Sequence, residues 1–393
     1  MLDLEINLSE LVRALSQALD LAEYNTFVHH GQRVAYIAVR VGQTLGLNET
    51  GLRALYYGGL LHDIGVTGAG GVRRLEDELF LKSHGTIGAL LVAKLPLPEV
   101  PLLVKHHHES YDGSGVNGLR GDNIPIGARL LNLADAVDAC VAGQELSLVL
   151  KESVAAMVQG GRGSSFDPDA CDAFLSTIKQ DRFWFDLQGR NLYSALQMLQ
   201  MDSTSKVDCD ELESIALVFA DIIDSKSRFT RTHSVGLAVL VRKVAQANSL
   251  SERTDKLLFS AGLLHDLGKL AVPNEILEKP SGLTPEEYYI VKSHVYYTKA
   301  ILSQVRGLSE LANWAGNHHE RLDGRGYADR LPASALGVED RLMAICDVYQ
   351  ALTEERPYRQ GESPRKALEI IESMVKGGGL CPKATGMVAN TVL

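Results

Sequence analysis

The sequence predicts an all-α protein made of two tandem helical bundles, copies of one domain. Apolar residues recur at steps of three and four along much of the chain, the period of an amphipathic helix, and no stretch keeps the strict alternation of a half-buried strand. The order of polar motifs in the first 200 residues also restarts after Asp208. We therefore expect two domains, at residues 1–200 and 205–393, with strands at most incidental.

Five helices are predicted in the first copy, and some of them have a local start or stop signal. Asn48 is expected to cap the third helix, and Pro96 and Pro98 to stop the fourth. A polar loop at 106–115 follows, and an aromatic segment at 181–190 is interpreted as interdomain packing. The predicted helices cover residues 8–21, 28–45, 48–63, 82–95 and 126–141.

The second copy repeats this order. Thr284-Pro-Glu-Glu has the pattern of a capping box, which should open a helix that carries Ser293-His294. A polar loop at 317–327 repeats the loop of the first copy. The other predicted helices cover residues 212–224, 232–244, 251–266 and 338–351.

Composition narrows the class of protein. The 393 residues are 45% hydrophobic and 22% charged, and the net charge of −10 without a basic block disfavours DNA or RNA polymers as partners. Five scattered cysteines without a CxxC spacing indicate reduced packing thiols. The N-terminus is acidic and no apolar run approaches ~18 residues, so we expect a soluble, cytoplasmic protein with no membrane contact.

The central motif is the adjacent pair His265-Asp266 in an apolar run, which His62-Asp63 repeats 203 positions earlier. Adjacent His and Asp side chains at one helix end can both reach a divalent metal, and the carboxylate can bridge two. A single pair of this kind is more often a chance surface feature. Here, however, all twelve histidines lie in or directly beside two constellations that recur in the same order, which favours metal binding.

Each constellation contains five imidazoles and two carboxylates. That number exceeds the three or four protein ligands usual for one zinc ion, so two metals sharing a bridging Asp fit better, and the mixed ligands suit Fe, Mn or Zn. The first set is His30, His62, Asp63, His84, His107, His108 and Asp135, and the second is His233, His265, Asp266, His294, His318, His319 and Asp347.

With these motifs, the chain resembles the HD superfamily of metal-dependent phosphohydrolases, specifically its HD-GYP branch. The resemblance covers nearly all of residues 205–393, through segments 225–234, 265–269, 318–327 and 347–359. It implies a cyclic-dinucleotide phosphodiesterase that converts cyclic di-GMP to linear pGpG, with a second step to GMP left open. It further implies two divalent metal ions per catalytic domain, Fe or Mn in the first place, with Zn, Ni or Mg as alternatives.

Carried over by position, the resemblance implies two ligand groups that share Asp266. One ion would be held by His233, His265, Asp266 and Asp347, and the other by Asp266, His294, His318 and His319. Some members bind a third ion through a Glu four residues before the first histidine. That position is Phe229 here, so we predict a dinuclear site.

Catalysis is assigned to Asp266 and Lys269 on the same basis. Lys269 should lie one helical turn beyond His265, where its ammonium could meet the phosphate or protonate the leaving group. A lone Lys or Arg is usually a solvated charge, and only the motif changes this interpretation. The name-giving Gly-Tyr-Pro reads Gly326-Tyr327-Ala328, which should loosen that turn and affect substrate preference. The predicted substrate-binding residues are Lys269, Arg325, Tyr327, Arg356 and Arg359.

Residues 1–200 resemble the same family more weakly. All ligand positions are kept, but Val66 replaces the lysine, Val116 replaces the tyrosine, and nothing like Arg-Pro-Tyr-Arg follows Asp135. We predict that this copy can hold metal but turns substrate over poorly, as a regulatory or dimer-forming domain. The alternative is that it acts on a different substrate.

Three functions stay open from the sequence. The first is a cyclic-dinucleotide phosphodiesterase, with cyclic di-GMP as default substrate and 3′,3′-cyclic GMP-AMP (cGAMP) as rival. The second is a non-catalytic cyclic-dinucleotide-binding signalling module. The third, an HD enzyme acting on nucleoside phosphates, is disfavoured by the Gly-Tyr and Arg-Pro-Tyr-Arg elements. A homodimer or a signalling-protein partner is compatible with each of them.

Overall fold

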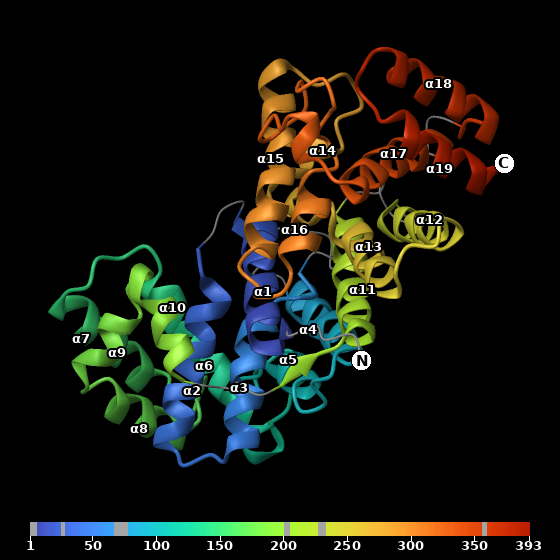
Figure 1. Ribbon diagram of the computed structural model, residues 1–393. Helices are drawn as coiled ribbons and strands as arrows, with labels where there is room; N and C mark the ends of the chain where they lie inside the picture. Colours follow the sequence, from blue (N-terminus) through green and yellow to red (C-terminus); the bar gives the residue numbers. More distant parts are fainter. Residues whose placement is uncertain (1–5, 25–27, 67–77, 200–204, 227–232, 356–359) are drawn as a thin grey trace. The chain divides into compact units, whose positions relative to one another are not determined.

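The computed structural model describes residues 6–24, 28–66, 78–199, 205–226, 233–355 and 360–393 (Figure 1). Within these ranges the protein is all-α, as predicted. Strands are confined to β1 (Ile6–Asn7) and β2 (Lys206–Val207), which pair antiparallel with Ile6 opposite Val207. The expectation that strands are incidental is therefore confirmed for the described residues.

The chain divides into two compact units. The N-terminal unit is Leu15–Ser205, and the C-terminal unit combines Met1–Ala14 with Lys206–Leu393. The pairing of β1 with β2 joins the first residues to the C-terminal unit. Our division at residues 200–205 placed this N-terminal stretch in the first domain, whereas its described part, residues 6–14, groups with the C-terminal unit.

In the N-terminal unit, each predicted helix is present, with small shifts at the ends. Asn48 caps its helix by accepting the backbone N–H of Gly51, as predicted. The helix predicted to stop at Pro96 ends earlier, at Val92. The helices are α1 (Leu8–Tyr24, which begins in the other unit), α2 (His30–Thr44), α3 (Glu49–Leu61), α4 (Glu78–Val92), α5 (Pro101–His106), α6 (Ile126–Val141), α7 (Leu148–Gly160), α8 (Pro168–Thr177), α9 (Asp181–Asp186) and α10 (Gly189–Met198).

The C-terminal unit repeats the order. The capping box at Thr284 is present, since its side chain accepts the Glu287 N–H and the Glu287 carboxylate accepts the Thr284 N–H. The elements are α11 (Cys209–Ser225), α12 (His233–Ala247), α13 (Glu252–Leu264), the 3₁₀ helix η3 (Leu267–Ala271), α14 (Asn274–Leu277), α15 (Pro285–Leu302), α16 (Ser309–Gly316), α17 (Val338–Thr353), α18 (Pro364–Lys376) and α19 (Pro382–Val392).

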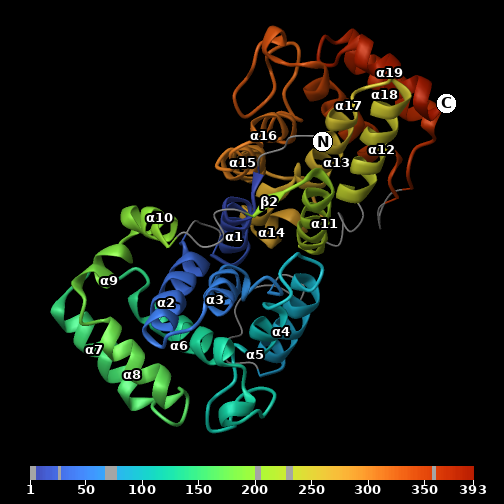
Figure 2. The same ribbon diagram turned by 60° about the horizontal axis from the view of Figure 1, so that its bottom comes forward.

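Equivalent helix pairs form the centre of each unit. In the N-terminal unit α2 packs on α3 and α6, and in the C-terminal unit α12 packs on α13 and α17 (Figure 2). Both pairs depend on a glycine. A Cβ at Gly59 would lie 2.4 Å from the Cα of Ala35, and one at Gly262 would lie 2.8 Å from the Cα of Ala238. This close approach brings the C-terminal end of α3 or α13 beside the helix that carries the first predicted ligand.

The aromatic segment 181–190 packs inside the N-terminal unit, so its interpretation as an interdomain segment was wrong. Phe183 and Trp184 of α9 are buried. The Phe183 ring lies 5.9 Å from the Tyr36 ring and 6.0 Å from the Phe174 ring, between centroids. Sequence alone could not distinguish an aromatic cluster that covers its own domain from one that faces another.

Two predictions from composition can be checked directly. All five cysteines are free thiols, and four of them are buried. No helix among the described residues combines the length and the apolar character needed to cross a membrane.

Candidate metal centres

The C-terminal unit brings together seven predicted ligands from separate elements. His265 and Asp266 lie between the end of α13 and the 3₁₀ helix η3, and both side chains reach one centre. The remaining ligands are His233 at the start of α12, His294 in α15, His318 and His319 after α16, and Asp347 in α17.

Asp266 lies between two groups of imidazoles. Its Oδ2 is 3.1 Å from Nε2 of His265, and its Oδ1 is 3.5 Å from Nε2 of His294. The two oxygens of one carboxylate thus face different groups, which is the geometry of a bridging ligand. Three sets of donor atoms lie close enough to share an ion: His233, His265 and Asp347; His265, Asp266 and His318; and His294, His318 and His319.

The backbone fixes the orientation of three of these imidazoles. Nδ1 of His265, His294 and His318 each lies within hydrogen-bond distance of the carbonyl oxygen three residues earlier, at 2.8, 2.6 and 2.6 Å. When Nδ1–H donates to a carbonyl, the neutral ring has only a lone pair at Nε2. The backbone therefore directs the metal-binding nitrogen of each ring toward the centre.

Two of these lone pairs face each other. Nε2 of His294 and Nε2 of His318 are 3.4 Å apart. Burial lowers the pKa of His294 to about 3 and that of His318 well below its usual value, so both rings are neutral at pH 7. Nε2 of His265 and Oδ1 of Asp266 are also buried without a hydrogen-bond partner. Such converging, unsatisfied donor atoms fit a bound cation.

The carboxylates of the centre are held ionised. Burial would raise the pKa of Asp266, but the neighbouring His265 and Lys269 outweigh it and keep that pKa well below the usual range. Burial would likewise raise the pKa of Asp347, but the hydrogen bond to His233 at 3.1 Å outweighs this and lowers that pKa. The centre thus has negative charge available for a cation.

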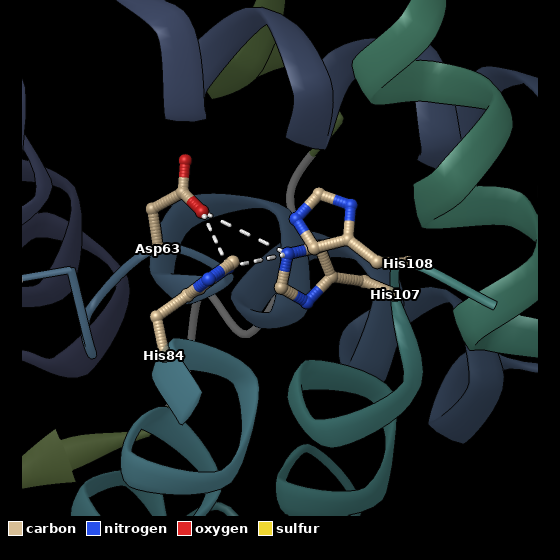
Figure 3. A group of neighbouring side chains, drawn as sticks. All are labelled: Asp63, His84, His107 and His108. Carbon is tan, nitrogen blue, oxygen red and sulfur yellow. Dashed lines mark hydrogen bonds and ion pairs between the residues drawn. The ribbon is translucent and has the colours of Figure 1, made fainter. Parts of the chain in front are cut away.

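The N-terminal unit builds an equivalent centre around Asp63. Its Oδ2 is 3.1 Å from Nε2 of His62 and 3.4 Å from Nε2 of His30. Its Oδ1 is 3.4 Å from Nε2 of His84 and 3.7 Å from Nε2 of His107. Figure 3 shows Asp63, His84, His107 and His108 pointing toward one another. The bridging arrangement is therefore present in both copies.

The other members of the first set also lie at this centre. Oδ1 of Asp135 is 3.5 Å from Nε2 of His30. Nε2 of His108 is buried without a hydrogen-bond partner, and burial holds the pKa of His108 well below its usual value. Nδ1 of His107 bonds to the carbonyl of Val104 at 2.6 Å, which leaves its Nε2 for the centre. These side chains fit a cation as those of the second set do.

A glycine two residues after each His-Asp pair allows the close packing that forms the centre. A Cβ at Gly65 would lie 2.1 Å from the carbonyl oxygen of His84, and one at Gly268 would lie 2.0 Å from that of His294. The turn after each pair thus contacts the backbone of the next ligand-bearing helix. Any larger residue would push that helix away.

Lys269 lies beside the centre, but on a different type of helix from the predicted one. We expected it one α-helical turn beyond His265, but α13 ends at Leu264 and the chain continues as the 3₁₀ helix η3. Its Nζ donates to Oδ2 of Asp266 at 2.5 Å, with the side chain 23% exposed. Val66 is buried at the equivalent place in the N-terminal unit.

The sequence analysis missed Glu320, which organises the loop after His318-His319. Its Oε1 accepts the N–H groups of Asp329 and Arg330 at 2.8 and 2.9 Å, and its Oε2 accepts that of Leu331 at 3.0 Å. Glu109 repeats this role, since it accepts the N–H groups of Asn117 and Leu119. The repeated His-His-Glu triplet was the signal that could have revealed it.

The predicted substrate-binding residues are only partly described. The Tyr327 ring lies 4.9 Å from the His319 ring and 6.4 Å from the Tyr288 ring, between centroids. Arg325 is exposed. The predictions that concern Phe229, Arg356 and Arg359 lie outside the described residues.

Comparison with known proteins agrees with the duplicated site. Residues 13–170 and 217–377 each match the model of the HD domain. The chain belongs to the HD domain family. Its relatives identify the HD-GYP branch, as the motifs of the second copy predicted. HD domains are metal-dependent, in agreement with the two clusters of His and Asp side chains.

Several relatives are cyclic-dinucleotide phosphodiesterases. The chain is 32% identical to 3′3′-cGAMP-specific phosphodiesterase 1 of Vibrio cholerae, over 95% of this chain and 89% of the relative. A cyclic di-GMP phosphodiesterase of Pseudomonas aeruginosa is 33% identical, over 41% of this chain and 42% of the relative. The crystal structure of a cyclic GMP-AMP-specific phosphodiesterase of V. cholerae, V-cGAP3, is similar with a TM-score of 0.71 and 27% identity, over 98% of both chains.

Proposed function

We propose that the chain is a cyclic-dinucleotide phosphodiesterase whose C-terminal unit hydrolyses 3′,3′-cGAMP in preference to cyclic di-GMP. The observation that carries the substrate choice is the extent of the similarity. Two relatives matching more than 90% of this chain, phosphodiesterases 1 and 3 of V. cholerae, are both cGAMP-specific. The cyclic di-GMP relative from P. aeruginosa matches 41% of it. Our default from the sequence was cyclic di-GMP, and the full-length matches favour its rival.

The C-terminal centre is proposed to hold two divalent ions, Fe or Mn, with Zn, Ni and Mg to be tested. One ion would take His233, His265, Asp266 and Asp347, and the other Asp266, His294, His318 and His319. The facing lone pairs of His294 and His318 and the two-sided contacts of Asp266 support this division. Bound ions of this kind lower the pKa of a coordinated water and polarise a phosphodiester.

The surrounding side chains are proposed to bind and orient the substrate. The ammonium of Lys269 is partly exposed beside Asp266, where it can meet a phosphate oxygen or supply a proton to the departing 3′ oxygen. The Tyr327 ring, packed beside His319, offers a face on which a base can stack. Arg325, Arg356 and Arg359 are proposed to contact phosphate or a guanine edge through their guanidinium groups.

The decisive experiment incubates the metal-loaded full chain with 3′,3′-cGAMP, cyclic di-GMP or cyclic di-AMP and separates the products. We expect the fastest turnover with 3′,3′-cGAMP, a linear dinucleotide as first product, and complete inhibition by a chelator. Faster turnover of cyclic di-GMP would overturn the substrate assignment. Binding of a cyclic dinucleotide without turnover, by metal-loaded protein, would favour the non-catalytic signalling module.

For the N-terminal unit we propose a metal-holding domain with a regulatory or dimer-forming role. It keeps the ligand geometry around Asp63, but Val66 takes the place of the lysine. The test uses the full chain with Asp266→Asn, so that residual turnover of any cyclic dinucleotide must come from the N-terminal unit. Absence of turnover is expected, and substantial hydrolysis would support the alternative of a second active site.

A further inference from the structure

In the N-terminal unit, a carboxylate outside the ligand set orients the first histidine. Nδ1 of His30 lies 2.7 Å from Oδ2 of Asp138, a buried residue of α6. Arg33 donates to both oxygens of the same carboxylate, through Nε and Nη2. Because Asp138 takes Nδ1, the opposite nitrogen of His30 faces His62 and Asp63.

In the C-terminal unit, a different residue contacts Nδ1 of the equivalent histidine. Nδ1 of His233 lies 3.3 Å from Oε2 of Glu354, while Nε2 lies 3.1 Å from Oδ1 of Asp347. Glu354 directly follows α17, and its side chain is 10% exposed. Asp138 comes three residues after its ligand Asp135, whereas Glu354 comes seven residues after Asp347. Residues three and seven positions after a ligand lie on the same face of a helix as that ligand, and these two positions are one turn apart.

Both members of the Arg33-Asp138 pair are replaced by other residues in the second copy. The position of Arg33 is Gly236 in the second copy, and the position of Asp138 is Gln350. A Cβ at Gly236 would lie 2.2 Å from Nε2 of Gln350, so the glutamine fills the space that an arginine would need. The second copy therefore has neither member of the Arg-Asp pair, and Glu354 approaches the histidine from the next turn.

We propose that Glu354 is a positioning residue of the C-terminal centre, which holds the His233 ring so that Nε2 faces the ion shared with His265 and Asp347. The proposal rests on the metal centre of the proposed function. Carboxylates that orient a ligating imidazole fix its tautomer, and their loss commonly weakens metal binding about 10–100-fold. The role assigned to Asp138 in one domain thus falls to Glu354 in the other.

The test is a titration of the metal-free full chain with Co²⁺ alone, followed by its visible absorption and by competition with a chelator. Glu354→Gln, which keeps the size of the side chain, should weaken one bound Co²⁺ about 10–100-fold and alter its absorption band. The matched control is Glu355→Gln at the neighbouring exposed residue, which should leave affinity and spectrum unchanged. Unchanged Co²⁺ binding by Glu354→Gln, or equal losses in both variants, would overturn the proposal.

A rescue experiment separates positioning from a general structural effect. Adding Gln350→Asp and Gly236→Arg to Glu354→Gln rebuilds the arrangement of the N-terminal unit in the C-terminal one. We expect this triple variant to recover most of the lost Co²⁺ affinity, and no recovery in a variant whose thermal unfolding matches wild type would contradict the role. If wild-type protein itself binds no Co²⁺, the proposed function fails; if wild type binds it and Glu354→Gln binds it equally, only the present inference fails.

Discussion

The two domains share a metal-binding geometry and differ in what surrounds it. Asp63 and Asp266 each face two groups of imidazoles at similar distances. Beside Asp266 stands Lys269, whereas Val66 occupies that place in the first domain. The comparison teaches that helix packing reproduces the ligand arrangement in both domains, while the side chains beside the bridging aspartate differ between them.

The largest expected effect comes from the bridging aspartates. Asp266→Asn should lower hydrolysis of 3′,3′-cGAMP by ~10³-fold or more, because it removes charge that both ligand groups share. Asp63→Asn should leave the rate within about twofold of wild type, because the C-terminal centre is not altered. Initial rates at saturating metal measure both, with circular dichroism to verify helical content. Equal losses in the two variants would refute a division of labour between the domains.

The next largest effect on turnover is expected from replacement of Lys269. Lys269→Met should lower kcat by about 100-fold, the scale of a lost general acid, while Co²⁺ binding is retained. Val66→Met, the matched change in the first domain, should leave kcat unchanged. Steady-state kinetics with metal analysis decides the outcome. A loss that appears only in KM would assign Lys269 to binding alone.

The amount of metal bound per chain tests whether the first domain binds metal. Asp63→Asn should reduce the metal bound per chain by about half, because each centre depends on its bridging carboxylate. Elemental analysis of protein dialysed against limiting chelator gives the content, with Asp266→Asn as the reciprocal variant. If Asp63→Asn retains the wild-type content, the N-terminal centre holds no metal.

Glu320 and Glu109 provide a matched pair in the two loops. Each accepts several backbone N–H groups, and loss of hydrogen bonds to a charged group costs about 1.5–3 kcal/mol. Glu320→Gln should lower stability and raise KM about tenfold, because its loop carries Arg325 and Tyr327. Glu109→Gln should lower stability by a similar amount with KM unchanged. Chemical denaturation and steady-state kinetics measure the two properties separately.

The smallest effect should be the same in both domains. Asn48 caps α3 and Ser251 caps α13, and each side chain accepts an N–H of the first turn. Replacement of either by Ala should cost ~1 kcal/mol of unfolding free energy without a change in kcat. A fall in kcat for Ser251→Ala would mean that the end of α13, with its His-Asp pair, depends on the beginning of that helix.

Much of this organisation could be predicted from the sequence. Helix periodicity located the ligand-bearing helices, and the recurrence of His-Asp and His-His pairs grouped side chains that are far apart in the chain. Asn48 and Thr284 were recognised as caps because their signals are local, and the structure confirms both.

Features that depend on tertiary packing were not predictable. The change from α13 to η3 at Asp266 accompanies the close approach of Gly268 to the backbone of His294, which no local pattern encodes. Glu354 lies beside a histidine 121 positions away, and no local pattern in the sequence gives a sign of this contact. The packing of Phe183 against Tyr36 was missed for the same reason.

The hydrogen bonds from Nδ1 to backbone carbonyls have a consequence for how such a duplicated protein can diverge. His62 and His107 in one domain, and His265 and His318 in the other, are oriented by the main chain three residues earlier. A point mutation changes a side chain but leaves a helix carbonyl in place. A duplicate can therefore lose its lysine and its tyrosine and still inherit its metal-binding geometry with its helices.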